Sequence, residues 1–212
     1  MEENSPKWYA VKVFFNRVFE MEDVIVGRGM EAYLPVEKIM LKGNEHMAAA
    51  RKLAAVPKDH RPDPRFIQEG PIIYERKPVV ASLMFVCATR DQLIDLDIYL
   101  QGNREFEDPK GFIYRTPDRK TFEEIPAKQM EIFRLVVSKG AGGLKFFADD
   151  DLTRFKQGQK VRVIDGPMKG AEGYIKRIKK NRRLLVCIEG VIAVATSYIP
   201  PKFLEPIEEE NN

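Results

Sequence analysis

Hydrophobic and polar positions follow different patterns in the two parts of the chain, and the patterns predict different structures. Residues 7–139 mix aromatic and β-branched runs with segments whose apolar residues recur every three or four positions. The first pattern is typical of strands and the second of helices. Residues 153–207 hold only short apolar runs between glycine, proline and charged residues, which indicates strands joined by tight turns.

The larger part is predicted to be an α+β unit. Its order is strand–helix–strand, an insert, then strand–helix–strand–helix, which favours helices on one face of an antiparallel sheet. The apolar run 78–89 is expected to be a central buried strand, and Pro35 an edge or a bulge. Residues 57–71 carry four prolines and are expected to form a loop. We expect strands at 7–15, 31–41, 78–89 and 111–115, and helices at 17–26, 44–56, 90–101 and 125–139, with Asn16 as the first N-cap.

The smaller part is predicted to be a small barrel, because it contains five short strands with tight turns. The glycine-rich stretch "GAGG" before it is typical of a linker. Strands are expected at about 160–164, 173–178, 184–188, 192–196 and 203–204. The predicted organisation is an N-terminal domain at 7–139 with an insert at about 41–75, a linker at 140–152, the barrel at 153–207 and an acidic tail at 208–212.

One turn of the barrel has a specific backbone requirement. In "DGPMKG", which starts at Asp165, Gly166 and Gly170 are expected to take positive φ and Pro167 to fix its own φ. Gly173 is expected where two neighbouring backbones pass closely.

Charge divides the chain in the same place. The chain has a net charge of +3, but its two parts differ in charge. Residues 152–207 are basic, with 12 Lys and Arg against 4 Asp and Glu. The acidic tail Glu208–Glu210 contributes −3, which leaves residues 1–151 slightly acidic. Two parts with different charge suggest different partners.

Six basic residues fall within one predicted hairpin of the barrel. They are either a solvated surface that keeps the hairpin soluble or a contact for phosphate groups or an acidic protein. No aromatic residue is interleaved with them, so base stacking is not expected. The six are Lys176, Arg177, Lys179, Lys180, Arg182 and Arg183.

Several function classes have no support in the sequence. No apolar run approaches the roughly 20 residues needed to span a bilayer, and the first residues lack the order of a secretion signal, so we expect a cytoplasmic protein with no membrane contact. Cys87 and Cys187 lie in apolar runs and are expected to be buried free thiols. With only His46 and His60 besides, no metal-ligand spacing exists. The run Asp149–Asp151 is expected to be a solvated helix start. No catalytic constellation is found, so no enzyme and no cofactor are expected.

Several motifs together carry a family resemblance. Residues 155–178, "FKQGQKVRVIDGPMKGAEGYIKRI", resemble the KOW motif of the NusG family of transcription elongation factors. "KWYAVKVF" at 7–14 and "EAYLPVEKI" at 31–39 resemble the family's first two strands. "GFIYRTPDR" and "IPAKQM" resemble its fourth strand and the start of its last N-domain helix. The match covers most of residues 7–40 and 76–207, and the order of the motifs is strongly specific.

The chain departs from the family at three places. The usual phenylalanine-proline-glycine-tyrosine sequence is "VASL" at 80–83, and the phenylalanine-glycine-arginine run is "EGVIA" at 189–193. The insert is also longer than in housekeeping members. These departures suggest a specialised paralogue that antiterminates particular operons. They weaken an assignment of Rho or ribosome binding.

The resemblance implies a ferredoxin-like N-domain, an SH3-like KOW barrel and a monomer that regulates transcription elongation or antitermination. Its N-domain would dock an exposed apolar patch on the clamp helices of RNA polymerase. Its barrel would recruit nucleic acid, the ribosome or another transcription factor. A KOW-type RNA- or ribosome-binding protein is the alternative, and docking of the barrel on the N-domain stays open. The expected patch comprises Trp8, which has a second interpretation as a core residue, Tyr33, Val80, Leu83 and Phe112.

Overall fold

The computed structural model describes residues 5–57, 60–102, 108–139, 144–148, 158–178, 181–188 and 190–207. Some predictions fall outside these ranges. They concern the "GAGG" stretch at 140–143, the run Asp149–Asp151, the hairpin lysines Lys179 and Lys180, Glu189 of "EGVIA", and the tail at 208–212.

An antiparallel sheet forms the centre of the N-terminal unit, which confirms its α+β class. Its strand order is β2-β6-β1-β7, and β8 also pairs with β1. β6 is buried along nearly its whole length, as predicted for a central strand, although it begins only at Leu83. The strands are β1 (Lys7–Val13), β2 (Glu31–Tyr33), β6 (Leu83–Ala88), β7 (Gly111–Ile113) and β8 (Glu124–Ile125).

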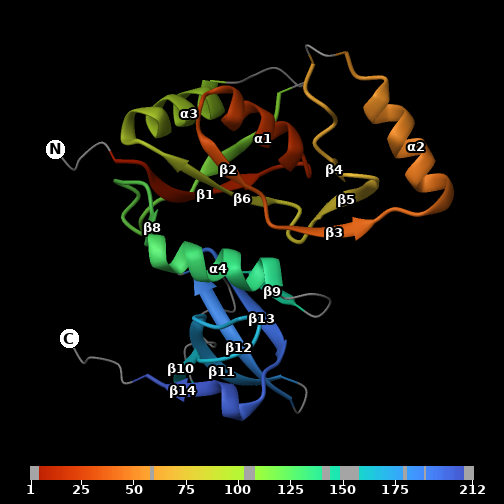
Figure 1. The fold of residues 1–212 in the computed structure, drawn as a ribbon. Helices are drawn as coiled ribbons and strands as arrows, with labels where there is room; N and C mark the ends of the chain where they lie inside the picture. The colour runs from red at the N-terminus through yellow and green to blue at the C-terminus, as the bar shows by residue number, and fades with distance from the viewer. Residues whose placement is uncertain are drawn as a thin grey trace.

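Helices cover both faces of this sheet, so the prediction of helices on one face only is wrong. The side chains of β1 alternate, and Tyr9, Val11 and Val13 pack with α1 (Val18–Gly27) and α3 (Arg90–Gly102). The opposite face packs against α4 (Ala127–Lys139), which lies below the sheet in Figure 1. The side chains of β6 are apolar on both faces of the sheet, so each face must be covered by another element.

The connection from β1 to α1 also differs from the prediction. β1 ends at Val13, and after Phe14 the two residues Phe15 and Asn16 both have φ of 57°. The N-cap of α1 is Arg17, with no side-chain capping hydrogen bond, rather than Asn16. Two successive left-handed residues therefore reverse the chain before the helix starts.

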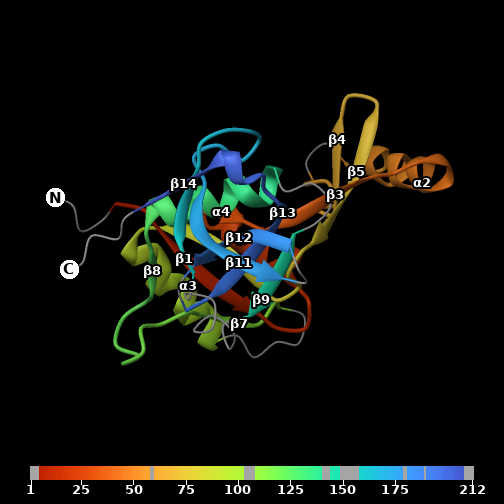
Figure 2. The same ribbon diagram turned by 90° about the horizontal axis from the view of Figure 1, so that it is seen from below.

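The insert forms an arm that projects from the N-terminal unit (Figures 1 and 2). The arm contains α2 (Gly43–Ala54) and a three-stranded sheet of order β3-β5-β4. Its strands are β3 (Val36–Met40), β4 (Phe66–Glu69) and β5 (Ile72–Pro78).

Two predictions are corrected in the arm. The strand expected at 31–41 is two strands in different sheets, because the chain leaves the central sheet at Leu34 and Pro35. The loop expected at 57–71 ends in β4, which turns through Gly70, at φ of 61°, into the unpredicted β5. The prolines obscured a hairpin whose strands are only four and seven residues long.

A largely buried ion pair fixes the arm to α1. Arg76 on β5 donates two hydrogen bonds of 2.7 Å to the Glu22 carboxylate and a third to the carbonyl of Pro64. The side chains of Arg76 and Glu22 are only 13% and 9% exposed. Because each charge compensates the other away from water, removing either one leaves an uncompensated buried charge.

We expect Arg76→Met to lower the free energy of unfolding by about 3 kcal/mol, because Glu22 then lies buried without its partner. Replacing both residues, as Arg76→Met with Glu22→Leu, should recover most of the stability. Urea denaturation of the three proteins measures this. An Arg76→Met protein as stable as the wild type would contradict the assignment.

The C-terminal unit is one six-stranded antiparallel sheet of order β14-β10-β11-β12-β13-β9. The strands are β9 (Lys145–Ala148), β10 (Lys160–Val163), β11 (Glu172–Ile178), β12 (Asn181–Ile188), β13 (Ile192–Tyr198) and β14 (Leu204–Pro206), with a 3-10 turn η2 (Pro201–Phe203). The five predicted strands are present. β9 lies where a linker was predicted, and within the described residues no strand pair closes the sheet into a barrel.

The C-terminal sheet packs on the N-terminal unit through α4 (Figure 1). A single apolar cluster joins Phe85 of β6, Phe133 of α4 and Leu184 of β12. The rings of Phe85 and Phe133 meet edge to face at 5.3 Å. The docking of the smaller unit, which the sequence left open, is thus present in the structure.

Within the described ranges, no helix is both long and apolar enough to cross a membrane.

Candidate macromolecular interface

Four of the five predicted patch residues project from one face of the central sheet. In β1, Trp8 and Lys12 point to the same side, and Leu83 and Phe112 lie directly opposite Lys12 on the two neighbouring strands. Tyr33 lies opposite Phe85, which shares the side of Leu83. Val80 precedes β6 and packs against the same cluster. This is the face that α4 and the C-terminal sheet cover.

Trp8 and Tyr33 are half-buried on either side of an α4 arginine. The guanidinium of Arg134 lies 5.4 Å from the ring centroid of Trp8 and 5.1 Å from that of Tyr33. Arg134 also donates a 3.2 Å hydrogen bond to Glu31. Burial raises the pKa of Tyr33 to about 12, although Arg134 acts in the opposite direction. These two rings therefore serve largely to hold α4 on the sheet.

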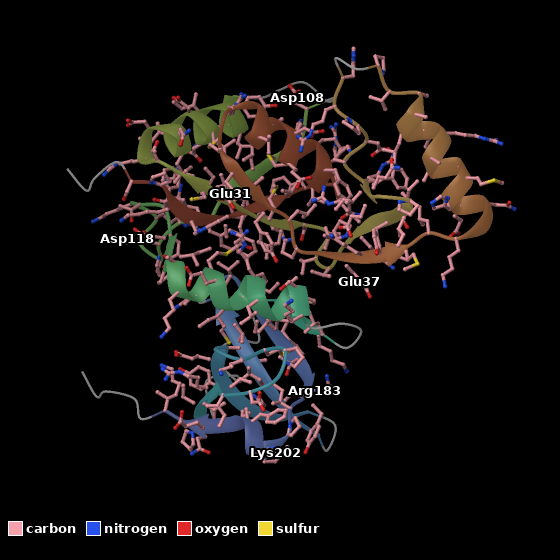
Figure 3. The ribbon with its side chains drawn as sticks, viewed as in Figure 1. Glu31, Glu37, Asp108, Asp118, Arg183 and Lys202 are labelled. Atoms are coloured by element: carbon pink, nitrogen blue, oxygen red, sulfur yellow. The ribbon has the colours of Figure 1, made fainter. Side chains whose placement is uncertain are left out.

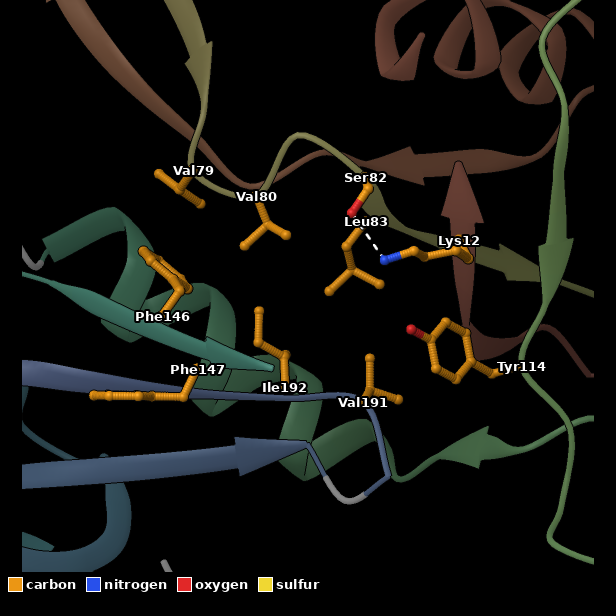
Figure 4. A pocket seen from close by; sticks show the side chains of 10 residues that line it. All are labelled: Lys12, Val79, Val80, Ser82, Leu83, Tyr114, Phe146, Phe147, Val191 and Ile192. Carbon is orange, nitrogen blue, oxygen red and sulfur yellow. Dashed lines mark hydrogen bonds between the residues drawn. The ribbon is translucent and has the colours of Figure 1, made fainter. Parts of the chain in front are cut away.

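Leu83 is buried, so the expectation that it lies uncovered on the surface is wrong. Only 3% of Leu83 is exposed, because the C-terminal sheet packs over it. Leu83 and Val80 face Val191 and Ile192 across a cavity of about 480 Å³ between the two units (Figure 4). At its rim the Lys12 ammonium donates a 3.0 Å hydrogen bond to the Ser82 hydroxyl. An aspartate at Leu83 would thus report on folding as well as on binding.

Phe112 remains 46% exposed and belongs to a surface cluster of aromatic rings. Its ring lies 5.9 Å from that of Phe14 and 5.5 Å from that of Tyr114. Phe14 in turn lies 6.3 Å from Phe15, whose side chain is 81% exposed. Phe15 has φ of 57°, in the left-handed region, where a bulky side chain is strained. Backbone strain of this kind clusters at functional sites. The predicted strand at 7–15 included Phe14 and Phe15, but β1 ends at Val13 and both rings are exposed.

The "DGPMKG" turn has the predicted backbone. Gly166 and Gly170 have φ of 83° and 91°, which confirms the expectation of positive φ. The Asp165 carboxylate accepts a 2.8 Å hydrogen bond from the Gly166 amide, and Pro167 lies within the turn. A Cβ atom at Gly173 would lie 2.2 Å from the carbonyl oxygen of Leu185, which confirms the predicted close approach.

We expect Gly173→Ala to destabilise the chain by about 2 kcal/mol or more, because a methyl group there forces β11 and β12 apart. Gly102→Ala is the matched control, since a Cβ atom at Gly102 meets nothing within 4 Å. Thermal or urea unfolding compares the two. Equal stability of the two variants would refute the close-approach explanation.

The basic residues of the hairpin are only partly described. The register places Lys176 opposite Arg183 and Arg177 opposite Arg182 on β11 and β12. Arg183 donates a 2.9 Å hydrogen bond to the Thr196 carbonyl of β13. The register thus brings four basic residues together on two neighbouring strands.

Among the described residues, an ionic contact joins the two units. The Glu172 carboxylate of β11 accepts hydrogen bonds from Lys128 of α4 at 3.0 Å and from Arg162 of β10 at 2.9 Å. Burial alone would raise the pKa of Glu172, but the hydrogen bonds from Lys128 and Arg162 outweigh it and hold the pKa below the ordinary 4.5. The carboxylate is thus the form that stabilises docking.

The sign of this shift gives a pH dependence. A carboxyl with a lowered folded-state pKa contributes stability above its unfolded pKa, about 4.5, and loses it as the pH falls through the folded-state value. We expect Glu172→Gln to be less stable than the wild type at pH 7, with the difference shrinking below about pH 4.5. Urea midpoints between pH 3 and pH 7 test this. A difference that is constant over this whole range would contradict it.

Chemistry of other kinds has little support in the described residues. Cys87 and Cys187 form no disulfide with each other, and both are half-buried rather than fully buried. Burial raises the pKa of Cys87, which opposes formation of a reactive thiolate. Within the ranges that the structure describes, no group of three or more His, Cys, Asp or Glu side chains is arranged to hold a metal ion.

No protein-family model matches the chain, and no curated protein matches it either.

Proposed function

We propose that this protein regulates transcription elongation or antitermination by binding the clamp helices of RNA polymerase with its N-terminal unit. The observation that carries the proposal is the exposed aromatic cluster of Phe14, Phe15 and Phe112, at the open end of the sheet face that holds the predicted patch. Exposed apolar clusters of this kind mark contact sites for other macromolecules. The resemblance of the sequence motifs to the NusG family supplies the identity of the partner.

The arrangement of the two units supports the same family. An α+β unit is followed by a small antiparallel sheet that carries the "DGPMKG" turn, in the order that the resemblance implies. We propose that the first is a ferredoxin-like N-domain of the NusG type and that the second is a KOW domain with an SH3-like core. The proposal involves no enzymatic step and treats the protein as a monomer.

Docking of the C-terminal unit gives the proposed function a closed state. In that state Val80 and Leu83 face Ile192, while the cluster around Phe112 stays accessible. Polymerase would first meet the exposed rings and would reach Val80 and Leu83 only after the units separate. If polymerase binds the separated form more tightly, it shifts the population toward that form. The released KOW domain could then recruit its own partner close to the polymerase.

The alternative is a KOW-type protein that binds RNA or the ribosome without acting on polymerase. The observation in its favour is the basic register of β11 and β12. The larger unit, by contrast, carries the exposed aromatic cluster. The first function therefore predicts that the N-terminal unit makes the main contact with its partner, and the alternative predicts that the C-terminal unit does.

Phe112→Asp and Phe15→Asp should each reduce retention of purified RNA polymerase by about tenfold or more, because a charge in an apolar contact must be desolvated. Ile98→Asp is the matched control, since Ile98 is 63% exposed on α3, away from the patch. A pull-down with full-length protein and a circular dichroism spectrum of each variant measure this. Equal retention by wild type, Phe112→Asp and Phe15→Asp would defeat the proposed docking face.

A further inference from the structure

The cavity between the two units has a polar side and an apolar side. Its volume of about 480 Å³ lies within the range of about 300–1,000 Å³ that is typical of pockets for small molecules. The polar side is formed by Lys12, Ser82 and Tyr114 of the N-terminal unit. Figure 4 shows the Lys12 ammonium and the Tyr114 hydroxyl pointing toward the middle of the cavity. The other side chains that line it are all apolar.

The apolar side of the cavity comes from both units. Val80 and Leu83 belong to the N-terminal unit, whereas Phe146, Val191 and Ile192 belong to the C-terminal unit. Leu83, Val191 and Ile192 are nearly fully buried. Val80 and Phe146 are only half-buried, so a molecule in the cavity would remove more of their apolar surface from water. Such a molecule would contact both units at once.

Lys12 brings a positive charge to this cavity without an acidic partner. Its half-buried ammonium donates a 3.0 Å hydrogen bond to the Ser82 hydroxyl, and among the described residues it forms no ion pair. A charge that is partly removed from water is normally compensated by an opposite charge, and such pairs attract more strongly among apolar groups than in water. The Ser82 hydroxyl carries no net charge, so an anionic ligand would supply the compensation.

The position of the cavity restricts the size of what binds in it. A folded protein or a nucleic acid would have to separate the two units before it reached Leu83 or Ile192, because both side chains are buried in the docked arrangement. A small molecule can enter while the units stay docked, since Lys12, Val80 and Phe146 keep part of their surface exposed.

We propose that this cavity binds a small carboxylate with an apolar body, with the carboxylate at Lys12 and the apolar body between Val80 and Ile192. A phosphate group would carry about two charges and three acceptor oxygens, which one ammonium does not satisfy. Because the ligand contacts both units, it binds the docked form more tightly than the separated form and stabilises docking. The inference goes beyond the proposed function, since it requires only the docked arrangement. Under the proposed function, the ligand would keep Val80 and Leu83 covered.

The test titrates the full-length protein with octanoate and with octanol, which has the same alkyl chain without the charge, by isothermal titration calorimetry without polymerase. We expect octanoate to bind about tenfold more tightly than octanol, because hydrogen bonds to charged groups are the stronger ones. Lys12→Met removes the charge and keeps the length of the side chain, so it should abolish this difference. Lys202→Met is the matched control and should bind as the wild type, since Lys202 is exposed and lies at the end of the C-terminal unit far from α4 (Figure 3).

Two further measurements test the apolar side independently of the charge. Val80→Phe places a larger side chain in the cavity, so it should weaken octanoate and octanol alike. Methyl NMR of the full-length protein should show octanoate shifting the signals of Leu83 together with those of Val191 and Ile192, because the ligand lies between the two units.

A parallel titration with phenylbutyrate distinguishes an aromatic body from an alkyl one, and tighter binding of either carboxylate supports the proposal. Absence of binding by both carboxylates overturns it, as does equal affinity of wild type and Lys12→Met for octanoate. Unchanged binding by Val80→Phe, or methyl shifts confined to one unit, overturns it too. Because polymerase is absent, these failures leave the docking at Phe112 untouched, and loss of polymerase retention leaves this result untouched.

Discussion

The packing of α4 between two sheets is the interaction on which the rest of the structure depends. Met130, Phe133 and Val136 of α4 are fully buried, and they join one apolar cluster with both sheets. A helix that is apolar on more than one side must be covered on more than one side. The central sheet provides one cover and the C-terminal sheet the other. Arg134, held by Trp8 and Tyr33, fixes the helix at its edge.

This packing decides which surfaces are available. It removes Leu83 from the surface and leaves the rings of Phe14, Phe15 and Phe112 open at the end of the same face. In the C-terminal sheet, Tyr198 of β13 is exposed, whereas Leu185, Ala193 and Ala195 are buried. The proposed polymerase contact at Phe112 thus stays accessible while the two units are docked.

The larger unit also depends on a polar contact that ties the arm to the body. Arg76 and Glu22 hold the arm against α1, while Arg76 also contacts the ring of Phe19 at 5.3 Å. A charged pair of this kind adds less to stability than an apolar contact of the same size, but its geometry fixes one orientation. The position of the arm relative to the sheet therefore depends on side chains 54 positions apart in the chain.

The sequence by itself determined the local features of this protein. Periodicity and alanine content predicted the four α-helices of the described residues, and the backbone of "DGPMKG" followed from glycine and proline alone. These features depend on neighbours in the chain, which a sequence displays. Tertiary structure decided the split at Pro35, the strand β9 in the expected linker, the second covered face and the burial of Leu83. It also decided that Lys12 and Ile192 line the same cavity. Each of these depends on which distant segment of the chain packs alongside. The sequence pattern around an apolar residue is the same whether the residue is covered by a partner or by its own chain.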